Sequence, residues 1–211
     1  MKYEDYARRV LLEDPWREFG LPRSGRVLDV GSGSGWGIAA LRDLGLDAIG
    51  LDPQARHPGG VRGDASRMPF RTSSFDGVVC LRTLHHIPPD REALREFGRV
   101  LRRGGFLFLT VGNALSYTFV LFRSRFTRET VSPCDPYYRP YHRRELSRLL
   151  AQAGFEITGL RACHYLPRRM ARGDGSPLLD LLASADRALG TRPPTNGIGP
   201  VLMACGRRQG K

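Results

Sequence analysis

The chain has 211 residues, 41% of them hydrophobic and 26% charged, which predicts one globular domain with a buried core. No apolar run approaches the roughly 20 residues of a transmembrane helix, and the polar N-terminus is not typical of a signal peptide, so a cytoplasmic location is expected. The formal net charge of +12 favours a polyanionic partner such as nucleic acid, if the charge is functional.

The kinds of basic and sulfur-containing residues narrow these classes further. All 33 basic residues except Lys2 and Lys211 are arginines, and they are spread along the chain. Bias in the coding sequence would explain this preference as well as function would, so nucleic acid is a possible but less favoured partner. The four cysteines are dispersed and have no paired spacing, which argues against a metal site and against a disulfide scaffold. No bound metal is expected.

Hydrophobic periodicity predicts alternating strands and helices in the first half of the chain. We expect a helix over residues 3–19, broken near Pro15, and a helix that Asp90 caps and that stops at Gly104-Gly105. A further helix is expected at 36–44, and strands are expected at 26–30, 47–51, 75–81 and 106–111. Such alternation indicates parallel strand pairing and a doubly wound α/β sheet.

The second half is less regular. We expect a helix at 145–153, a strand at 155–160, a short helix at 178–189 and a final strand at 198–205. The whole chain, 1–211, is interpreted as one domain, with a helical cap at 1–24, a ligand-binding core at 25–111, and lid-like insertions at 112–140 and 163–197.

A glycine-rich turn follows the first strand, in the sequence Asp29-Val30-Gly31-Ser32-Gly33-Ser34-Gly35. In an open parallel sheet, ligands bind beyond the carboxyl ends of the strands, where free N–H groups of the next helix point at them. The dinucleotide spacing fails, because Trp36 and Ile38 stand where its last glycine belongs, and no lysine is present for a nucleotide-phosphate loop. A ligand beside Asp29 is expected to be cationic, and S-adenosylmethionine, with an ammonium and a sulfonium but no phosphate, fits.

The chain resembles the class I S-adenosylmethionine-dependent methyltransferases of the small-molecule type. The resemblance is strong over residues 25–111 and extends in outline to the C-terminal third. It rests on six segments in the expected order, namely Val27–Gly35, Gly50-Leu51-Asp52, Gly63-Asp64-Ala65 with Met68-Pro69-Phe70, Phe75–Val79, Leu84–Ile87 and Val100–Gly105. It implies a Rossmann-like sheet with an antiparallel last strand.

The resemblance also implies which residues bind the cofactor. Beside Asp29, they are Gly31, Gly33 and Gly35 for the methionine moiety, Asp52 for the ribose hydroxyls, Asp64 and Ala65 for adenine, and Leu81 under the methionine chain. Alternative interpretations are turn or loop acids for the two later aspartates and a core residue for the leucine. One departure from the family pattern is the short spacing between Asp52 and Asp64, where Pro58-Gly59-Gly60 predicts a turn instead of a helix.

Two histidines follow the fourth predicted strand, next to the expected methyl position. We expect at most one of His85 and His86 to face the acceptor, where it would deprotonate or orient a hydroxyl; the alternative is a structural capping role. His142 is a weaker candidate.

The acceptor is expected to be a small molecule that is lipophilic or aromatic. The apolar stretch Tyr117–Phe122 and the tyrosines Tyr137, Tyr138 and Tyr141 lie where the family covers its acceptor, although they would serve equally as core under a long loop. The alternatives are an RNA-directed methyltransferase that uses the arginine-rich surface, and a protein that keeps the cofactor fold without methylating.

Overall fold

The computed structural model describes residues 3–116, 138–163, 181, 184–185 and 197–210. At its centre is a seven-stranded sheet with the order β3-β2-β1-β4-β5-β7-β6. Neighbouring strands are parallel from β3 to β5, whereas β7 runs antiparallel to both β5 and β6. The predicted fold class, a doubly wound sheet with an antiparallel last strand, is confirmed.

The elements follow one another in the predicted alternation. The strands are β1 (Arg26–Val30), β2 (Asp47–Asp52), β3 (Gly60–Arg62), β4 (Phe75–Leu81), β5 (Leu101–Gly112), β6 (Phe155–Cys163) and β7 (Val201–Arg208). The α-helices are α1 (Tyr3–Arg8), α2 (Asp14–Glu18), α3 (Trp36–Asp43), α4 (Asp90–Val100) and α6 (Arg143–Gln152), with a π-helix at Arg9–Glu13 and a 3-10 turn at Leu84–His86. The three-residue strand β3 was not predicted, because it is too short to show a period.

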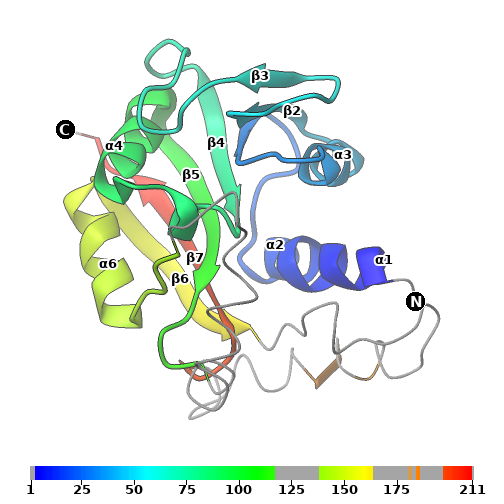
Figure 1. Ribbon diagram of the computed structural model, residues 1–211, viewed down its shortest axis with the longest axis vertical. Helices are drawn as coiled ribbons and strands as arrows, with labels where there is room; N and C mark the ends of the chain where they lie inside the picture. Colours follow the sequence, from blue (N-terminus) through cyan, green and yellow to red (C-terminus); the bar gives the residue numbers. More distant parts are fainter. Residues whose placement is uncertain (1–2, 117–137, 164–180, 182–183, 186–196, 211) are drawn as a thin grey trace.

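Helices cover both faces of the sheet (Figure 1), with α4 and α6 on one face and α2 and α3 on the other. Strand β4 shows why its sequence is almost continuously apolar. Val78 and Cys80 belong to the core under α4 and α6, whereas Val79 and Leu81 belong to the core under α2 and α3. Successive residues of a strand point to opposite faces, so a central strand buried on both sides needs apolar residues throughout.

The prediction that Pro15 breaks the N-terminal helix is wrong. The chain is helical from α1 through α2, and Pro15 lies in the first turn of α2. Directly before it, the Asp14 N–H donates to the Arg9 carbonyl, in the wider spacing of a π-helix. Because proline lacks an N–H and its ring crowds the preceding turn, the helix changes its hydrogen-bond spacing here instead of ending.

Two predictions about α4 are also wrong. The helix ends at Val100, because Leu101 is already extended (φ −73°, ψ 144°) and pairs with Phe75. Asp90 does not cap the helix through its side chain; Pro89 occupies that position. The Asp90 carboxylate instead accepts a hydrogen bond from the Tyr141 hydroxyl at 2.8 Å and pairs with Arg139. Both partners lie about 50 residues further along the chain, so a local sequence pattern could not predict these contacts.

The later predictions differ in outcome. The helix expected at 145–153 is α6, which begins two residues earlier and ends one residue earlier. The strand expected at 155–160 is β6, which extends to Cys163, and the strand expected at 198–205 is β7, which is shifted by three residues. Most of the two proposed lids, the stretch 117–122, Tyr137 and most of the helix expected at 178–189 lie outside the described residues. Within the described part of the chain, no helix is long and apolar enough to span a bilayer.

Candidate functional site

The strand order reverses between β1 and β4, because β1 pairs with β2 on one side and with β4 on the other. The turn 31–35 lies beyond the carboxyl end of β1, at this switch point, where ligands bind in open α/β sheets. The turn is closed by hydrogen bonds from Gly31 N to the Leu51 carbonyl and from Gly35 N to the Ser32 carbonyl, both at 2.7 Å. The predicted glycine turn therefore faces the predicted edge of the sheet.

Each glycine of the turn has a positive φ, but they differ in the space around them. A Cβ at Gly31 would lie 2.1 Å from the Thr83 side chain, and one at Gly35 would lie 2.8 Å from the His57 ring. Around Gly33 no atom lies within 4 Å of a Cβ position. The first and last glycines thus allow close packing, whereas the middle one leaves room for a ligand to approach the backbone.

Asp52, the last residue of β2, holds the turn from the neighbouring strand. Its Oδ2 accepts the Gly33 N–H at 3.0 Å, and its Oδ1 accepts the Gln54 N–H at 2.8 Å. Residues 53–59 form turns and no helix, as the spacing predicts. The structure therefore brings Gly33 and Asp52 together.

Asp29 is buried beneath the turn, with 2% of its surface exposed. Its carboxylate faces the first turn of α3, since a Cβ at Gly37 would lie 2.5 Å from Asp29 Oδ2. Burial, and then the negative charge of Asp52, raise the pKa of Asp29 to about 7. Desolvation disfavours the charged form of an acid, so a cationic ligand beside Asp29 would offset an existing penalty.

Asp64 and Ala65 follow β3 at the same edge of the sheet. The Gly63 N–H donates to the Asp52 carbonyl at 3.3 Å, which ties this segment to the end of β2. Asp64 is exposed, and its Oδ1 accepts both the N–H and the hydroxyl of Ser66 at 2.8 Å. Ala65 is buried and belongs to the core.

Strand β4 ends at Leu81, which is 8% exposed and packs into the core under α2 and α3. Arg82 then adopts a left-handed conformation (φ 53°), and its N–H donates to Thr110. The Thr83 hydroxyl donates to the Leu81 carbonyl at 3.0 Å, while the side chain of Thr83 packs on Gly31. These contacts turn the chain sharply away from the sheet before the two histidines.

The environments of the two histidines differ. His85 is 2% exposed, and its Nδ1 has no hydrogen-bond partner among the described residues, whereas His86 is half-buried. The His85 ring lies 5.1 Å from the Tyr138 ring in an edge-to-face arrangement. Burial, and then His86 and Arg82, lower the pKa of His85 well below its ordinary value, so the buried imidazole is neutral.

Sequence reasoning missed two contributors to this site. His57 covers the glycine turn, with its Nε2 2.9 Å from the Ser32 Oγ. Thr83, two residues beyond the end of β4, packs its side chain on Gly31. His57 lies in an irregular turn and Thr83 beyond a strand end, so no period marks either. His142 is exposed at the start of α6. The described residues contain no cluster of three His, Cys, Asp or Glu side chains that could hold a metal ion.

A family model described as a methyltransferase domain matches residues 3–160, well over half of the chain. The chain belongs to the class I S-adenosylmethionine-dependent methyltransferases. The strand order and the position of the glycine turn agree with this membership. Membership of the family explains why the site lies at the switch point of the sheet. The contacts that the glycine turn makes with Asp52, Thr83 and His57 are observed in this chain itself.

Individual relatives are distant. A demethylmenaquinone methyltransferase from Beutenbergia cavernae is 34% identical over 129 residues, which cover 50% of this chain and 54% of that protein. The chain thus spans about half the length of the first curated relatives that it matches. Among solved structures, an S-adenosylmethionine-dependent methyltransferase from Thermotoga maritima is 20% identical, with a TM-score of 0.67. The match covers 98% of this chain and 95% of that one. The 1,6-didemethyltoxoflavin N1-methyltransferase of Burkholderia thailandensis, solved with S-adenosylhomocysteine, is 19% identical, with a TM-score of 0.60. The match covers 98% of this chain and 78% of that one.

Proposed function

We propose that the chain transfers a methyl group from S-adenosylmethionine to a small lipophilic or aromatic acceptor. The observation that carries the proposal is the convergence of buried Asp29, the glycine turn and Asp52 at the switch point of the sheet. When bound, the cofactor supplies a methyl group on a sulfonium, which an in-line nucleophile displaces. The protein's own task is to hold the two reactants in line and to exclude water.

The side chains at this edge fit the cofactor. Asp29 would face its cationic groups, and the turn 31–35 would receive its carboxylate through backbone N–H groups. Asp52 already accepts one hydrogen bond at each oxygen, but a carboxylate has about four acceptor positions, so both ribose hydroxyls can still be accepted. Asp64 and Ala65 would contact adenine, and Leu81 would support the methionine chain.

His85 is the better candidate of the two histidines for the acceptor. A buried polar atom without a partner costs about 1–3 kcal/mol, and a hydroxyl of the acceptor would supply the missing hydrogen bond to its Nδ1. A group whose pKa is so far lowered holds a full proton poorly, so His85 would orient the acceptor hydroxyl more than it deprotonates it. Tyr138, whose hydroxyl lies against Gly112 at the end of β5, forms the adjoining wall.

The names of relatives support the class of acceptor. Demethylmenaquinone and didemethyltoxoflavin, which appear in the names of the Beutenbergia and Burkholderia proteins, each contain a planar ring system. A planar acceptor suits a site walled by His85 and Tyr138, because aromatic faces stack on flat rings.

Cofactor binding is the first experiment. Isothermal titration with S-adenosylhomocysteine should give a defined Kd for the wild type, and D52N should weaken binding about tenfold or more through the lost ribose contacts. The matched control is D47N, which changes an exposed aspartate at the opposite end of β2. Absence of binding by the wild type, or equal affinities of D52N and the wild type, would contradict the assignment.

Turnover is the second experiment. An acceptor screen with methyl-labelled cofactor should find incorporation into a planar, apolar substrate. H85A should then lower kcat about tenfold to a hundredfold without changing the cofactor Kd, and H86A should have a smaller effect. Binding without turnover on any acceptor would instead favour the non-methylating alternative. Full activity of H85A would remove His85 from the acceptor site.

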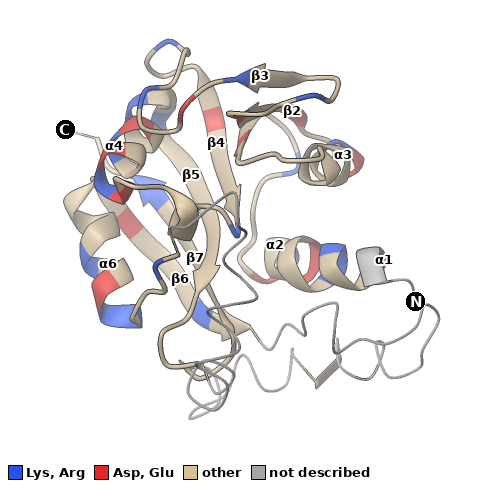
Figure 2. Ribbon diagram, in the orientation of Figure 1, with Lys and Arg blue, Asp and Glu red and all other residues tan. Residues whose placement is uncertain are grey.

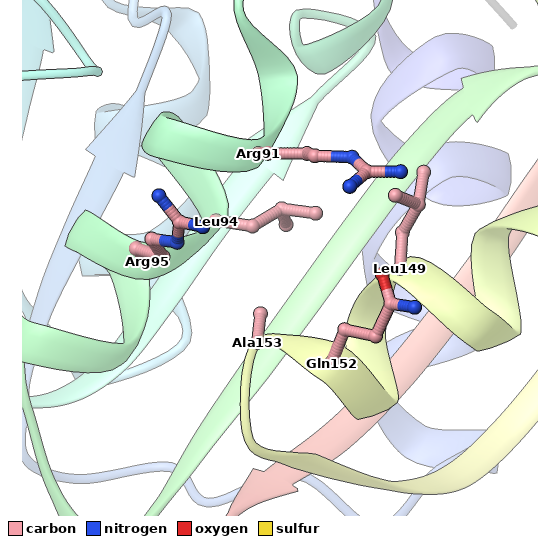
Figure 3. Close-up of a pocket in the computed structure, with 6 residues that line it drawn as sticks. All are labelled: Arg91, Leu94, Arg95, Leu149, Gln152 and Ala153. Atoms are coloured by element: carbon pink, nitrogen blue, oxygen red, sulfur yellow. The ribbon is translucent and has the colours of Figure 1, made fainter.

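One surface favours RNA as a second candidate substrate. Basic residues lie among acidic ones on α4 and α6 (Figure 2). A groove of about 50 Å³ lies between the two helices, with Arg91 and Arg95 of α4 on one side and Leu149 of α6 on the other (Figure 3). Arg144 and Arg148 are exposed on α6. None of these four arginines forms an ion pair with a described residue. RNA binding that falls steeply with salt, and that R91Q/R95Q weakens, would favour this candidate.

A further inference from the structure

The segment that follows Asp64 needs support from outside itself. Residues 65–70 contain no helix and no strand, and the turn 53–59 before β3 provides no helix beside them. Ala65 and Met68 point into the core, which fixes the depth of the segment. The N–H groups of Ser66 and Arg67 are satisfied locally by Asp64. Other backbone groups of this irregular segment need partners outside it, and those hydrogen bonds help to set the direction of the backbone.

Two residues of α4, Glu96 and Arg99, make those hydrogen bonds. Glu96 Oε2 accepts the Met68 N–H at 2.7 Å. The Arg99 guanidinium donates to the Phe70 carbonyl at 2.7 Å and to the Met68 carbonyl at 3.1 Å. Three backbone groups of the segment are therefore held from one turn of α4.

The two side chains also lock each other in place. Arg99 donates to both oxygens of Glu96, from Nε at 2.6 Å and from Nη2 at 2.8 Å. The hydrogen bond from Arg99, together with the one from Met68, lowers the pKa of Glu96 against the opposing effect of burial. Two-point arginine–carboxylate pairs of this kind are geometrically specific and stronger than hydrogen bonds between neutral groups. We name this arrangement of Glu96 and Arg99 on Met68 and Phe70 the α4 clamp.

We propose that Glu96 and Arg99 are positioning residues for adenine recognition, because the α4 clamp fixes the backbone that presents Asp64 and Ala65 to the cofactor. This inference rests on the proposed function, in which Asp64 and Ala65 contact adenine. A rigid presentation matters because a displacement of about 1 Å can cost about a hundredfold in a well-aligned site.

The test compares adenine with hypoxanthine in otherwise identical ligands. Titration with S-adenosylhomocysteine and with S-inosylhomocysteine gives two Kd values for each variant. The Kd for S-inosylhomocysteine divided by the Kd for S-adenosylhomocysteine measures recognition of the purine edge. In R99M we expect the Kd for S-adenosylhomocysteine to rise about tenfold and the ratio to fall toward one, with kcat at saturating cofactor within about twofold. R99K should recover part of the affinity, because lysine keeps the charge but not the planar fork.

Controls separate positioning from stability and from failure of the proposed function. E92Q changes an exposed acid one turn earlier on α4 and should match the wild type. If R99M does not fold, E96Q tests the same clamp with a neutral side chain of the same shape, and we expect about a threefold rise in Kd. D64A serves as the direct-contact reference.

Each outcome has a separate meaning. Folded R99M and E96Q with unchanged affinity and unchanged ratio would overturn the positioning role, even if their melting temperatures fell. Unchanged binding by D64A would also overturn it, because the segment would then not meet adenine. A wild type that binds neither ligand would contradict the proposed function itself, before any variant is compared.

Discussion

Replacing Asp29 by asparagine should stabilise the protein and weaken its cofactor binding at the same time. The side chain is 2% exposed, and its pKa rises from an ordinary 3.8 to about 7. Between these two pH values the folded state keeps a proton that the unfolded chain releases. The free energy of unfolding must therefore fall as the pH rises from about 4 to about 7, and stay level above that.

The size of this effect follows from the same pKa values. Each pH unit over which the two states differ by one proton is worth about 1.4 kcal/mol, so the interval from 3.8 to about 7 gives an upper limit of about 4 kcal/mol. D29N has no charge to desolvate. We expect it to exceed the wild type in stability by up to that amount at pH 8, and by only about 1 kcal/mol near pH 4.5.

Binding should change in the opposite direction. At pH 8 the ionised Asp29 can pair with the cationic groups of S-adenosylmethionine, and the loss of a hydrogen bond to a charged group costs about 1.5–3 kcal/mol, or about tenfold to a hundredfold in Kd. Near pH 5.5 the wild-type carboxyl is protonated, because its pKa is about 7, so the affinities of D29N and the wild type should converge.

Urea unfolding without ligand and isothermal titration with S-adenosylmethionine, each at low and high pH, test both predictions. The control is D47N, whose carboxylate is exposed and should leave both measurements unchanged. A stability difference between D29N and the wild type that is the same at pH 4.5 and pH 8 would refute the buried-charge explanation. Undiminished affinity of D29N at pH 8 would refute the pairing with the cofactor.

Three further predictions concern the surroundings of the site. G31A places an alanine in a left-handed conformation where its Cβ would overlap the Thr83 side chain, and it should lower the free energy of unfolding in urea by about 2–5 kcal/mol. G33A has open space around its Cβ and should lower it by only about 1–2 kcal/mol. Equal losses would contradict the packing argument. Arg161, 5% exposed, pairs with Glu18 of α2 at 2.8 Å. E18Q leaves this buried guanidinium without its counter-charge and should lose about 2 kcal/mol in the same unfolding experiment, more than R161M, which leaves only Glu18, whose side chain is 32% exposed. H57A removes the cover of the glycine turn and should raise the Kd for S-adenosylhomocysteine about threefold to tenfold with no change in kcat; a drop in kcat alone would place His57 elsewhere in the reaction.

Much of the core fold could be predicted from local patterns. Apolar runs, glycine turns and helical spacing are properties of neighbouring residues, and they marked β1, α3, β2 and β4. The errors lie where distant residues decide. The end of α4 depends on the pairing of Leu101 with Phe75, and the position of Asp90 depends on Arg139 and Tyr141.

The outline of the site was predictable for a similar reason. In a parallel sheet, residues at the carboxyl ends of strands meet at one edge, so Asp29, the glycine turn and Asp52 could be placed together before their contacts were known. Their roles toward the cofactor remain predictions. Neither the support of Met68 by α4 nor the cover of Ser32 by His57 follows from spacing, because each joins segments more than 20 residues apart.

The glycine turn and its two acids were thus determined by the sequence itself, because their order along parallel strands dictates where they lie. Only the tertiary structure decided the state of the groups there. It buried Asp29 deeply enough to raise its pKa. It also distinguished His85 from His86, because it buried the first imidazole and left the second half-buried, although both rings lie beside Tyr138. Burial and electrostatic environment depend on every segment packed around a side chain, and no stretch of neighbouring residues contains that information.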